Sequence, residues 1–188
     1  MKKIKRCEWT GNDELMIKYH DEEWGVPVED DKKVFEFIIL ESSQAGLSWK
    51  TILHKREDYR EAFSNFDFDK VSRYTSKDIK KLLKNSKIIR NKLKITSTIS
   101  NAKKFIELRK EFGSFRNYLD TFAKFPIINK IKNVKNIPTK TELSDRISAD
   151  LKKRGFKFMG STIFYAHMQA TGMVDDHVNH CFRKGKRK

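Results

Sequence analysis

Residues 30–49, DDKKVFEFIILESSQAGLSW, decide the fold. Asp30 and Asp31 are suited to begin a helix, because a carboxylate accepts hydrogen bonds from the free N–H groups of a first turn. The stretch that follows is apolar on nearly all sides, which is typical of a helix buried in a core. The sequence therefore predicts a buried helix from Lys32 to about Ala45. Its apolar residues are Val34, Phe35, Phe37, Ile38, Ile39 and Leu40.

The rest of the chain also favours helices. Nothing alternates between apolar and polar residues over the length of a strand, so we predict an all-α fold class. Residues 124–141 carry two prolines, polar breaks and basic residues, which predicts a long surface connection. Further helices are predicted from Asn12-Asp13 to about Glu23, from Ser48 onward, and over 68–74, 76–85, 91–112, 114–123, 142–153 and 161–171.

The composition indicates a folded protein. Its 188 residues allow one domain, or one domain with a small lobe, at about 100–200 residues per domain. Hydrophobic residues make up 38% of the chain, which excludes a disordered protein, and two cysteines are too few for a disulfide scaffold. No apolar run reaches the ~18 residues of a membrane span, and the N-terminus lacks the apolar stretch of a secretory signal. We therefore expect a soluble intracellular protein with no membrane partner.

Basic residues greatly outnumber acidic ones. Lys and Arg total 41 against 25 Asp and Glu, which gives a formal net charge of +16. Such an excess costs self-repulsion in the compact state, and it is typical of proteins that bind a polyanion such as nucleic acid. The alternative is a lysine-rich, AT-biased genome that makes many proteins basic. The charges spread over most of the chain, which disfavours an amphipathic helix on a membrane surface.

Glu41 follows directly on the apolar helix, on the same stripe as Val34 and Ile38. A carboxylate in such a place is costly unless it is paired or hydrogen-bonded. Burial would raise its pKa, and donors around it would lower the pKa again. The next residues are small and polar around one large ring, Trp49, with a turn at Gly46. This pattern indicates a pocket wall; the alternative is a carboxylate at a helix end that faces water.

The two cysteines pair with histidines in a pattern suited to a metal. His177 and Cys181 are four residues apart, so on a helix they would share a face. Cys7 and His20 near the other end complete a tetrahedral set for structural zinc, which would tie the chain ends together. The alternatives are free cysteines with ordinary histidines, or a Cys–His nucleophilic pair. The competing histidines are His54, His167 and His180.

The predicted helices 142–153 and 161–171 are joined by a short link, GFKFMG, over residues 155–160. Free N–H groups at the start of the second helix, with Lys157 nearby, are suited to hold one DNA phosphate without reading sequence. The alternative is an ordinary turn between helices. His167 lies on the apolar side of the second helix and is predicted to be a core or pocket histidine.

These motifs together match a known family. They are CEW (7–9), YHDEEWGVP (19–27), LESSQAGLSW (40–49), KREDYR (55–60), IR (89–90), LKKRGFKFMG (151–160), MQA (168–170), DHV (176–178) and Cys181. The chain resembles the DNA-3-methyladenine glycosylase I family, a divergent branch of the helix-hairpin-helix glycosylase superfamily. The resemblance extends over nearly the whole chain and is densest over residues 40–49; residues 110–145 are the least distinctive.

The resemblance implies an all-α helix-hairpin-helix glycosylase fold in which one structural Zn²⁺ joins the two ends of the chain. It implies a single glycosylase unit over residues 1–188. We expect a helical bundle lobe over roughly 30–140, a zinc-stapled lobe from 1–29 with 141–182, and a basic tail over 183–188. The zinc ligands implied are Cys7, His20, His177 and Cys181.

The resemblance also implies the site residues. A flipped base would lie among aromatic rings, with Glu41 hydrogen-bonded to the adenine edge; a role for Glu41 as general base is less favoured. The family lacks the catalytic Asp of its superfamily, so Asp175 and Asp176 are expected to cap a zinc-ligand helix or to orient His177. The rings implied are Trp9, Tyr19 and Trp49; the loop that fills the gap in the duplex is Gln44, Gly46 and Leu47; the hairpin contacts to DNA are Lys157 and Gly160.

The function implied is a monofunctional DNA glycosylase of base excision repair. It would flip 3-methyladenine out of alkylated double-stranded DNA and hydrolyse the N-glycosidic bond. We expect a monomer in the bacterial cytoplasm, associated with the nucleoid through DNA. One alternative is a non-catalytic, zinc-stapled DNA-binding module for damaged DNA, and another is a lyase that uses a lysine Schiff base.

Overall fold

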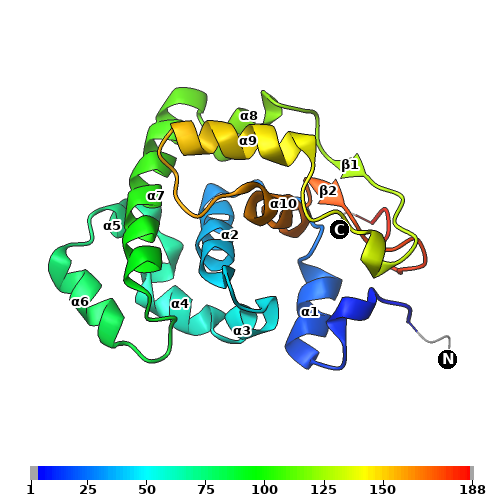
Figure 1. The fold of residues 1–188 in the computed structure, drawn as a ribbon, viewed down its shortest axis with the longest axis horizontal. Coiled ribbons are helices and arrows are strands. Elements are labelled where there is room, and N and C mark those ends of the chain that lie inside the picture. The colour runs from blue at the N-terminus through cyan, green and yellow to red at the C-terminus, as the bar shows by residue number, and fades with distance from the viewer. Residues whose placement is uncertain (1–3, 187–188) are drawn as a thin grey trace.

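The computed structural model describes residues 4–186, and ten α-helices make up most of this part of the chain (Figure 1). The prediction of a helical fold is confirmed. No helix within the described residues is long and apolar enough to cross a membrane. The helices are α1 (Glu14–Glu22), α2 (Asp31–Gln44), α3 (Trp49–His54), α4 (Arg56–Ala62), α5 (Phe68–Ser72), α6 (Ser76–Lys84), α7 (Lys92–Phe112), α8 (Phe115–Asp120), α9 (Glu142–Lys153) and α10 (Ser161–Ala170), with 3₁₀ turns at Glu8–Thr10, Ser64–Phe66 and Val134–Asn136.

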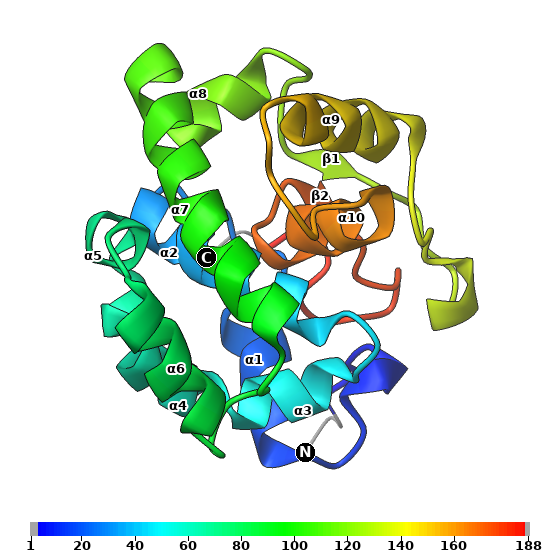
Figure 2. The ribbon, with the colours of Figure 1, turned by 60° about the vertical axis from the view of Figure 1, so that its left-hand side comes forward.

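Helix α2 lies at the centre of the molecule and packs against α3, α7, α8 and α10 (Figure 1, Figure 2). Asp30 begins it as predicted: the carboxylate accepts hydrogen bonds from the N–H groups of Lys32 and Lys33 at 3.2 and 3.3 Å. Every residue from Val34 to Ser43 is buried. The last turns of this helix therefore carry Glu41 into the interior.

Helix α4 has no local signal that predicts it. It begins at Arg56 without a capping side chain and is short and highly charged. Arg56 is buried and donates to Glu23 on the α1 side at 2.8 Å and to Glu36 of α2 at 2.6 Å. Contacts between segments far apart in the sequence stabilise this helix, so its position could not be derived from local pattern.

The prediction of a surface connection over residues 124–141 was wrong for part of that range. Strand β1 (Ile127–Ile128) pairs in parallel with β2 (Val174–Asp175). Ile131 is 4% exposed, and its carbonyl accepts a hydrogen bond from Asn179 N–H at 2.7 Å. A strand of two residues is too short to show an alternating pattern, so only the pairing with the C-terminal segment reveals it.

The two ends of the described chain lie side by side. Phe182 N–H donates to the Lys5 carbonyl at 2.9 Å. A small hydrophobic cluster forms around this contact, next to the larger core built on α2 and α7, and it includes Cys7, Met16, Tyr19, Trp24, Ile131, Val178 and Cys181. The fold thus brings the predicted zinc ligands from both ends into one region.

Gly172 is required where the chain leaves α10 and crosses the segment that follows Trp24. Its φ is +68°, and a Cβ there would lie 2.5 Å from Pro27 N and from Val26 C. These are backbone atoms, so they cannot turn aside as a side chain would. We expect Gly172→Ala to lower the free energy of unfolding by about 2–4 kcal/mol, measured by urea titration.

The matched control is Gly185→Ala. Its φ is +73°, and a Cβ there has open space around it. Only the cost of a left-handed backbone, about 1–2 kcal/mol, applies at this position. An equal or larger loss for Gly185→Ala would contradict the steric explanation of Gly172.

Candidate functional site

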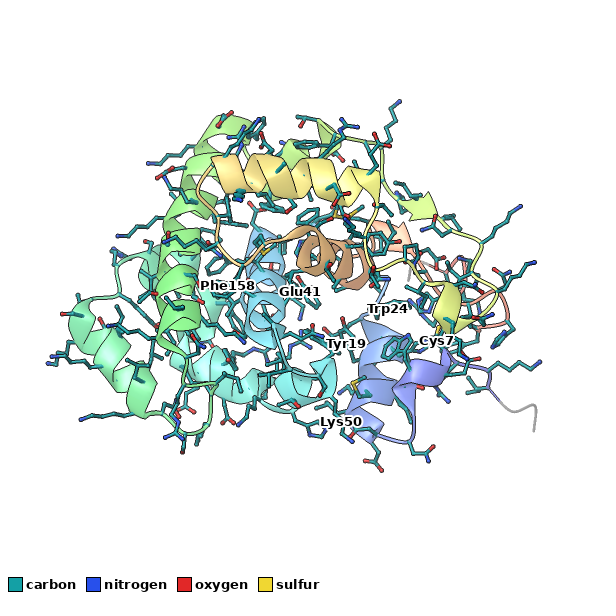
Figure 3. All side chains as sticks on the ribbon, viewed as in Figure 1. Cys7, Tyr19, Trp24, Glu41, Lys50 and Phe158 are labelled. Carbon is teal, nitrogen blue, oxygen red and sulfur yellow. The ribbon has the colours of Figure 1, made fainter. Side chains whose placement is uncertain are left out.

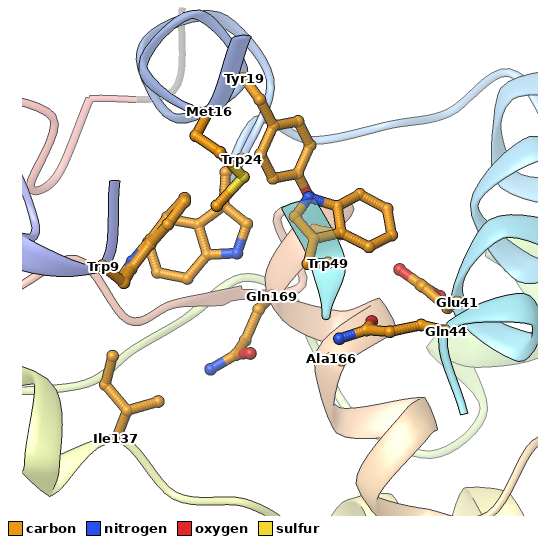
Figure 4. A pocket seen from close by; sticks show the side chains of 11 residues that line it. Trp9, Met16, Tyr19, Trp24, Glu41, Gln44, Trp49, Ile137, Ala166 and Gln169 are labelled. Carbon is orange, nitrogen blue, oxygen red and sulfur yellow. The ribbon is translucent and has the colours of Figure 1, made fainter. Parts of the chain in front are cut away.

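A cavity of about 290 Å³ opens between α1, α2, α3 and α10 (Figure 4). This volume lies near the lower end of the range for ligand pockets, about 300–1,000 Å³, so it suits one heterocycle better than a whole nucleotide. Four of its eleven lining residues are aromatic, and only Glu41 is acidic. The lining is Trp9, Met16, Tyr19, Trp24, Glu41, Gln44, Trp49, Ile137, Ala166, Gln169 and Ala170.

The structure brings the four predicted pocket residues to this one cavity. The ring centroids of Tyr19 and Trp49 are 5.2 Å apart and their planes are tilted by 47°. The Trp9 ring centroid lies 6.3 Å from that of Tyr19, with tilted planes, and 5.0 Å from that of Trp24 in an edge-to-face contact. Such contacts fix each ring against its neighbours. The result is a set of walls that a flat, cationic ring can contact.

Several lining residues were not predicted. Met16 precedes Tyr19 by three residues on α1, and Ala166, Gln169 and Ala170 share one face of α10, so helical spacing could have found them. No signal in the sequence points to Ile137. It reaches the cavity from the segment that was expected to be a surface connection, downstream of the pairing of β1 with β2.

Glu41 is 1% exposed and lies against His167 of α10. The two atoms in contact are Glu41 Oε2 and His167 Nδ1, 2.8 Å apart. In its charged form the carboxylate accepts the Nδ1 hydrogen. This contact contradicts the alternative of a carboxylate that faces water at a helix end, and it places His167 in the core beside the pocket, as expected.

The other oxygen of Glu41 is unsatisfied. Among the described residues, Glu41 Oε1 and the indole Nε1 of Trp49 are buried with no hydrogen-bond partner. Leaving a buried acceptor and a buried donor unpaired costs about 1–3 kcal/mol each. Both residues line the same cavity, and in Figure 4 the Glu41 carboxylate points toward its open centre. A ligand with a complementary donor and acceptor would satisfy both groups.

Burial shifts the pKa of two titratable pocket residues, Glu41 and Tyr19. It raises the pKa of the Glu41 carboxyl above its ordinary value, and the contact with His167 opposes that rise. Burial, with the Glu41 charge added, raises the pKa of the Tyr19 phenol well above 10. Tyr19 therefore keeps its proton at neutral pH and is available as a hydrogen-bond donor.

Of the two roles expected for Asp175 and Asp176, the structure excludes the helix cap, and only Asp175 contacts His177. Residues 176–182 contain no helix, so there is none to cap, and His177 and Cys181 do not share a helix face. Asp176 is buried and accepts from Gln169 Nε2 at 2.8 Å and from Tyr165 at 2.8 Å, which fixes the Gln169 amide in the pocket wall. Asp175 does accept from the backbone N–H of His177, at 3.1 Å.

The four predicted zinc ligands form one buried cluster able to hold a metal ion, with ligand atoms all within 4.8 Å of one another. Cys181 Sγ lies 3.4 Å from His20 Nε2 and 3.6 Å from His177 Nδ1, and Cys7 Sγ lies 3.6 Å from the same His177 atom. Zinc bonds of about 2.3 Å to sulfur and about 2.0–2.1 Å to nitrogen would set tetrahedral S···N separations of about 3.6 Å. The donor set therefore fits a tetrahedral zinc ion.

Groups around the cluster orient its ligands. His20 Nδ1 lies 2.7 Å from Asp21 Oδ1, which leaves Nε2 toward the sulfurs. His177 Nε2 lies 3.2 Å from the Trp24 carbonyl, which leaves Nδ1 toward them. Such partners on the far ring nitrogen are typical of metal-binding histidines. The side-chain hydrogen bond with Cys181, together with burial, raises the pKa of the Cys7 thiol. A bound cation would oppose this rise, because it favours the thiolate.

The predicted DNA-contact residues lie in two segments near the pocket. In the loop after α2, Gly46 has a φ of +80° and Leu47 is 40% exposed, whereas Gln44 turns inward to line the cavity. The hairpin between α9 and α10 carries Phe158, which Figure 3 labels. Beside it Lys157 is exposed, and Gly160 is the N-cap of α10.

The chain is similar to a well-defined set of proteins. The family model described as methyladenine glycosylase matches residues 9–184. The DNA-3-methyladenine glycosylase of Haemophilus influenzae is 46% identical over 177 residues, covering 94% of this chain and 96% of the relative. DNA-3-methyladenine glycosylase 1 of Escherichia coli is 45% identical over 179 residues, covering 95% and 96%.

Solved structures agree with these matches. A crystal structure of 3-methyladenine DNA glycosylase I superposes with a TM-score of 0.91 at 46% identity, covering 95% of this chain and 98% of the other. The Staphylococcus aureus enzyme, described for its recognition of 3-methyladenine, has a TM-score of 0.92 at 32% identity, covering 97% and 98%. The family expected from the sequence motifs is confirmed. The chain therefore belongs to the methyladenine glycosylase family of enzymes.

Proposed function

We propose that this chain flips 3-methyladenine out of alkylated double-stranded DNA and hydrolyses the bond between the base and its sugar. The observation that carries the proposal is Glu41: a buried carboxylate with one unpartnered oxygen in a ring-lined cavity the size of one base. Two relatives are named as glycosylases of this base, and a variant of a similar enzyme, 32% identical, was solved in complex with 3-methyladenine.

The pocket chemistry suits a cationic purine. Methylation at N3 gives adenine a positive charge, and the faces of Tyr19 and Trp49 attract a cation. Glu41 Oε1 accepts a hydrogen from the exocyclic amine and opposes the charge. Normal adenine is neutral, so the pocket stabilises it less. Because flipping costs a few kcal/mol and least for a damaged base, these differences select the lesion.

The positive charge of the base also reduces the catalysis that the enzyme must supply. It leaves with the electron pair of the N-glycosidic bond as a neutral purine, so no general acid is required. The sugar develops oxocarbenium character, which the adjacent DNA phosphates stabilise, and water adds at the anomeric carbon and loses its proton to the surrounding water. Glu41 is the one acidic residue among the described residues that line the cavity. Its proposed contact with the base assigns it to recognition of the base.

Two exposed segments contact the DNA duplex. Leu47, raised on the turn at Gly46, fills the gap that the flipped base leaves in the duplex. The α9–hairpin–α10 unit acts as a helix-hairpin-helix element, with the first N–H groups of α10 after Gly160 directed at a phosphate. The net charge of +16 favours DNA as the partner over any neutral ligand. The enzyme acts as a monomer in the bacterial cytoplasm, where the DNA is.

One structural zinc would join the chain ends. Cys7, His20, His177 and Cys181 would hold it, and its chemistry here is structural because four protein ligands fill a tetrahedral shell. The cluster lies behind the pocket wall: Trp24, whose carbonyl faces His177, lines the cavity. A zinc ion held there would help to fix the aromatic wall at Trp24, and it would not touch the base.

Release of free base tests the proposal against its rivals. Purified protein is incubated with duplex DNA that carries 3-methyladenine, and the products are separated by chromatography. We expect free 3-methyladenine and an intact abasic strand. Binding without release would favour a non-catalytic module for damaged DNA. A protein–DNA adduct trapped by borohydride would favour a lyase with a lysine Schiff base.

Acid should weaken recognition of the cationic base. Because burial raises the pKa of Glu41, the carboxyl takes up a proton at a higher pH than an exposed glutamate. Excision of 3-methyladenine at subsaturating DNA should therefore fall as the pH drops through that raised pKa. The ¹³C chemical shift of the Glu41 carboxyl, followed against pH, reports the titration. A Glu41 pKa at or below about 4.3, the exposed value, would contradict the prediction.

A further inference from the structure

One side of α7 carries polar residues where a core-facing helix would be apolar. Ser97, Thr98 and Asn101 are all buried there, at 2%, 4% and 1% exposure. Buried polar groups are costly unless hydrogen bonds satisfy them. Lys94 and Asn101, seven residues apart, lie on nearly the same face, about 10 Å apart along the helix axis. Each of these two makes hydrogen bonds to a different segment beside the pocket.

Lys94 reaches the end of α2. Its Nζ donates to the carbonyls of Ser43 at 2.9 Å and Ala45 at 2.6 Å, immediately before the turn that carries Leu47. A lysine in the first turn of α7 is unfavourable for α7 itself, since the positive end of the helix dipole lies there. The same charge is favourable at the carbonyl end of α2, whose last turn has no basic residue of its own.

Asn101 holds the hairpin. Its Nδ2 donates to the Lys157 carbonyl at 2.9 Å, and its Oδ1 accepts from Lys157 N–H at 2.8 Å. The next residue, Phe158, has a φ of +55°, a left-handed conformation that an aromatic residue adopts only when its surroundings impose it. The Phe158 carbonyl accepts from Ser42 Oγ of α2 at 3.4 Å. The hairpin runs beside α7 on its way to α10 (Figure 1, Figure 2).

We infer that Lys94 and Asn101 are positioning residues that fix the loop of Leu47 and the hairpin of Lys157 at one separation along α7. The inference rests on the proposed function, in which both segments contact the duplex. A loop that fills the gap and a hairpin that holds a phosphate must engage one bent DNA together, so their spacing sets how well the lesion enters the pocket. A misplacement of about 1 Å costs up to about 100-fold in rate. Neither Lys94 nor Asn101 lines the cavity that would hold the base.

The test compares excision from DNA with binding of the free base. Lys94→Met and Asn101→Ala are each expected to lower kcat/KM on 3-methyladenine duplex by about 10–100-fold. The Kd for free 3-methyladenine, read from tryptophan fluorescence, should change by less than about twofold, because no pocket residue changes. Lys94→Arg, which keeps a cationic donor, should restore most of the excision.

Ser97→Ala is the matched control. Its hydroxyl is buried on the same side of α7 but donates only to the Lys94 carbonyl of its own helix. We expect duplex excision to stay near the wild-type rate. Unchanged excision in Lys94→Met and Asn101→Ala would overturn the inference. So would an equal loss of excision and of free-base affinity, which would indicate general damage to the fold.

Amide hydrogen exchange gives a readout that does not depend on activity. Leu47 N–H donates to Gln44, and Lys157 N–H donates to Asn101. We expect faster exchange at Leu47 in Lys94→Met and at Lys157 in Asn101→Ala, with other core amides unchanged. Unchanged exchange at both amides would overturn the inference that Lys94 and Asn101 fix these two segments. Failure of the proposed function would instead show in the wild-type chain, as no release of base.

Discussion

Glu41→Gln is expected to weaken binding of 3-methyladenine by about 10–100-fold and to slow its excision while the fold stays intact. The substitution keeps the shape of the side chain but removes the charge, and a hydrogen bond to a charged group contributes about 1.5–3 kcal/mol. The variant should be at least as stable as the wild type, because it no longer buries a carboxylate. Calorimetric titration with the free base and thermal unfolding measure the two effects.

The control for this prediction is Glu61→Gln, which removes a charge from a side chain that is 79% exposed. It should leave free-base affinity and excision unchanged. Should Glu41→Gln keep wild-type affinity and excision, Glu41 would have no place in the site. A loss of folding in Glu41→Gln would assign it a structural role through His167 instead.

Removal of the metal is expected to have the largest effect on stability. We expect about one zinc per chain by elemental analysis, because the four-ligand cluster is complete and buried. Cys181→Ser should lose the metal and unfold the region where the chain ends meet. Structural zinc supplies about 10–16 kcal/mol in isolated zinc-binding peptides, so a drop in Tm of more than about 10 °C is expected. Strong chelators should act in the same way.

His180→Ala is the matched control for the metal prediction. His180 precedes Cys181 but its ring is 43% exposed and lies 3.2 Å from Glu8, outside the cluster. Its replacement should change neither the zinc content nor Tm by a measurable amount. A metal-free wild-type protein with an unchanged Tm would show that packing alone joins the chain ends.

The starts of most helices were predictable, because each capping residue directly precedes its helix in the sequence. Asp13, Ser48 and Asn91 each accept from an N–H of the helix that follows, close to the predicted starts. Helix α4 and strand β1 were missed because ion pairs and pairing with distant segments define them. Such contacts leave no periodic pattern in one sequence.

The parts of the site that could be predicted are those whose residue types are unusual in their sequence context. A carboxylate after an apolar run pointed to Glu41, and the two cysteines with two histidines pointed to the cluster. The partner of Glu41 could not be derived, because His167 meets it only when α10 packs on α2. The spacing of His177 and Cys181 suggested a helix, but a turn after β2 brings them together: Cys181 N–H donates to the Val178 carbonyl at 2.8 Å.

The most direct test of the central claim is a crystal structure of the chain with free 3-methyladenine. We predict the purine in the cavity between Tyr19 and Trp49, with its exocyclic amine within hydrogen-bond distance of Glu41 Oε1. A purine bound outside this cavity, or inside it with no contact to Glu41, would contradict the account.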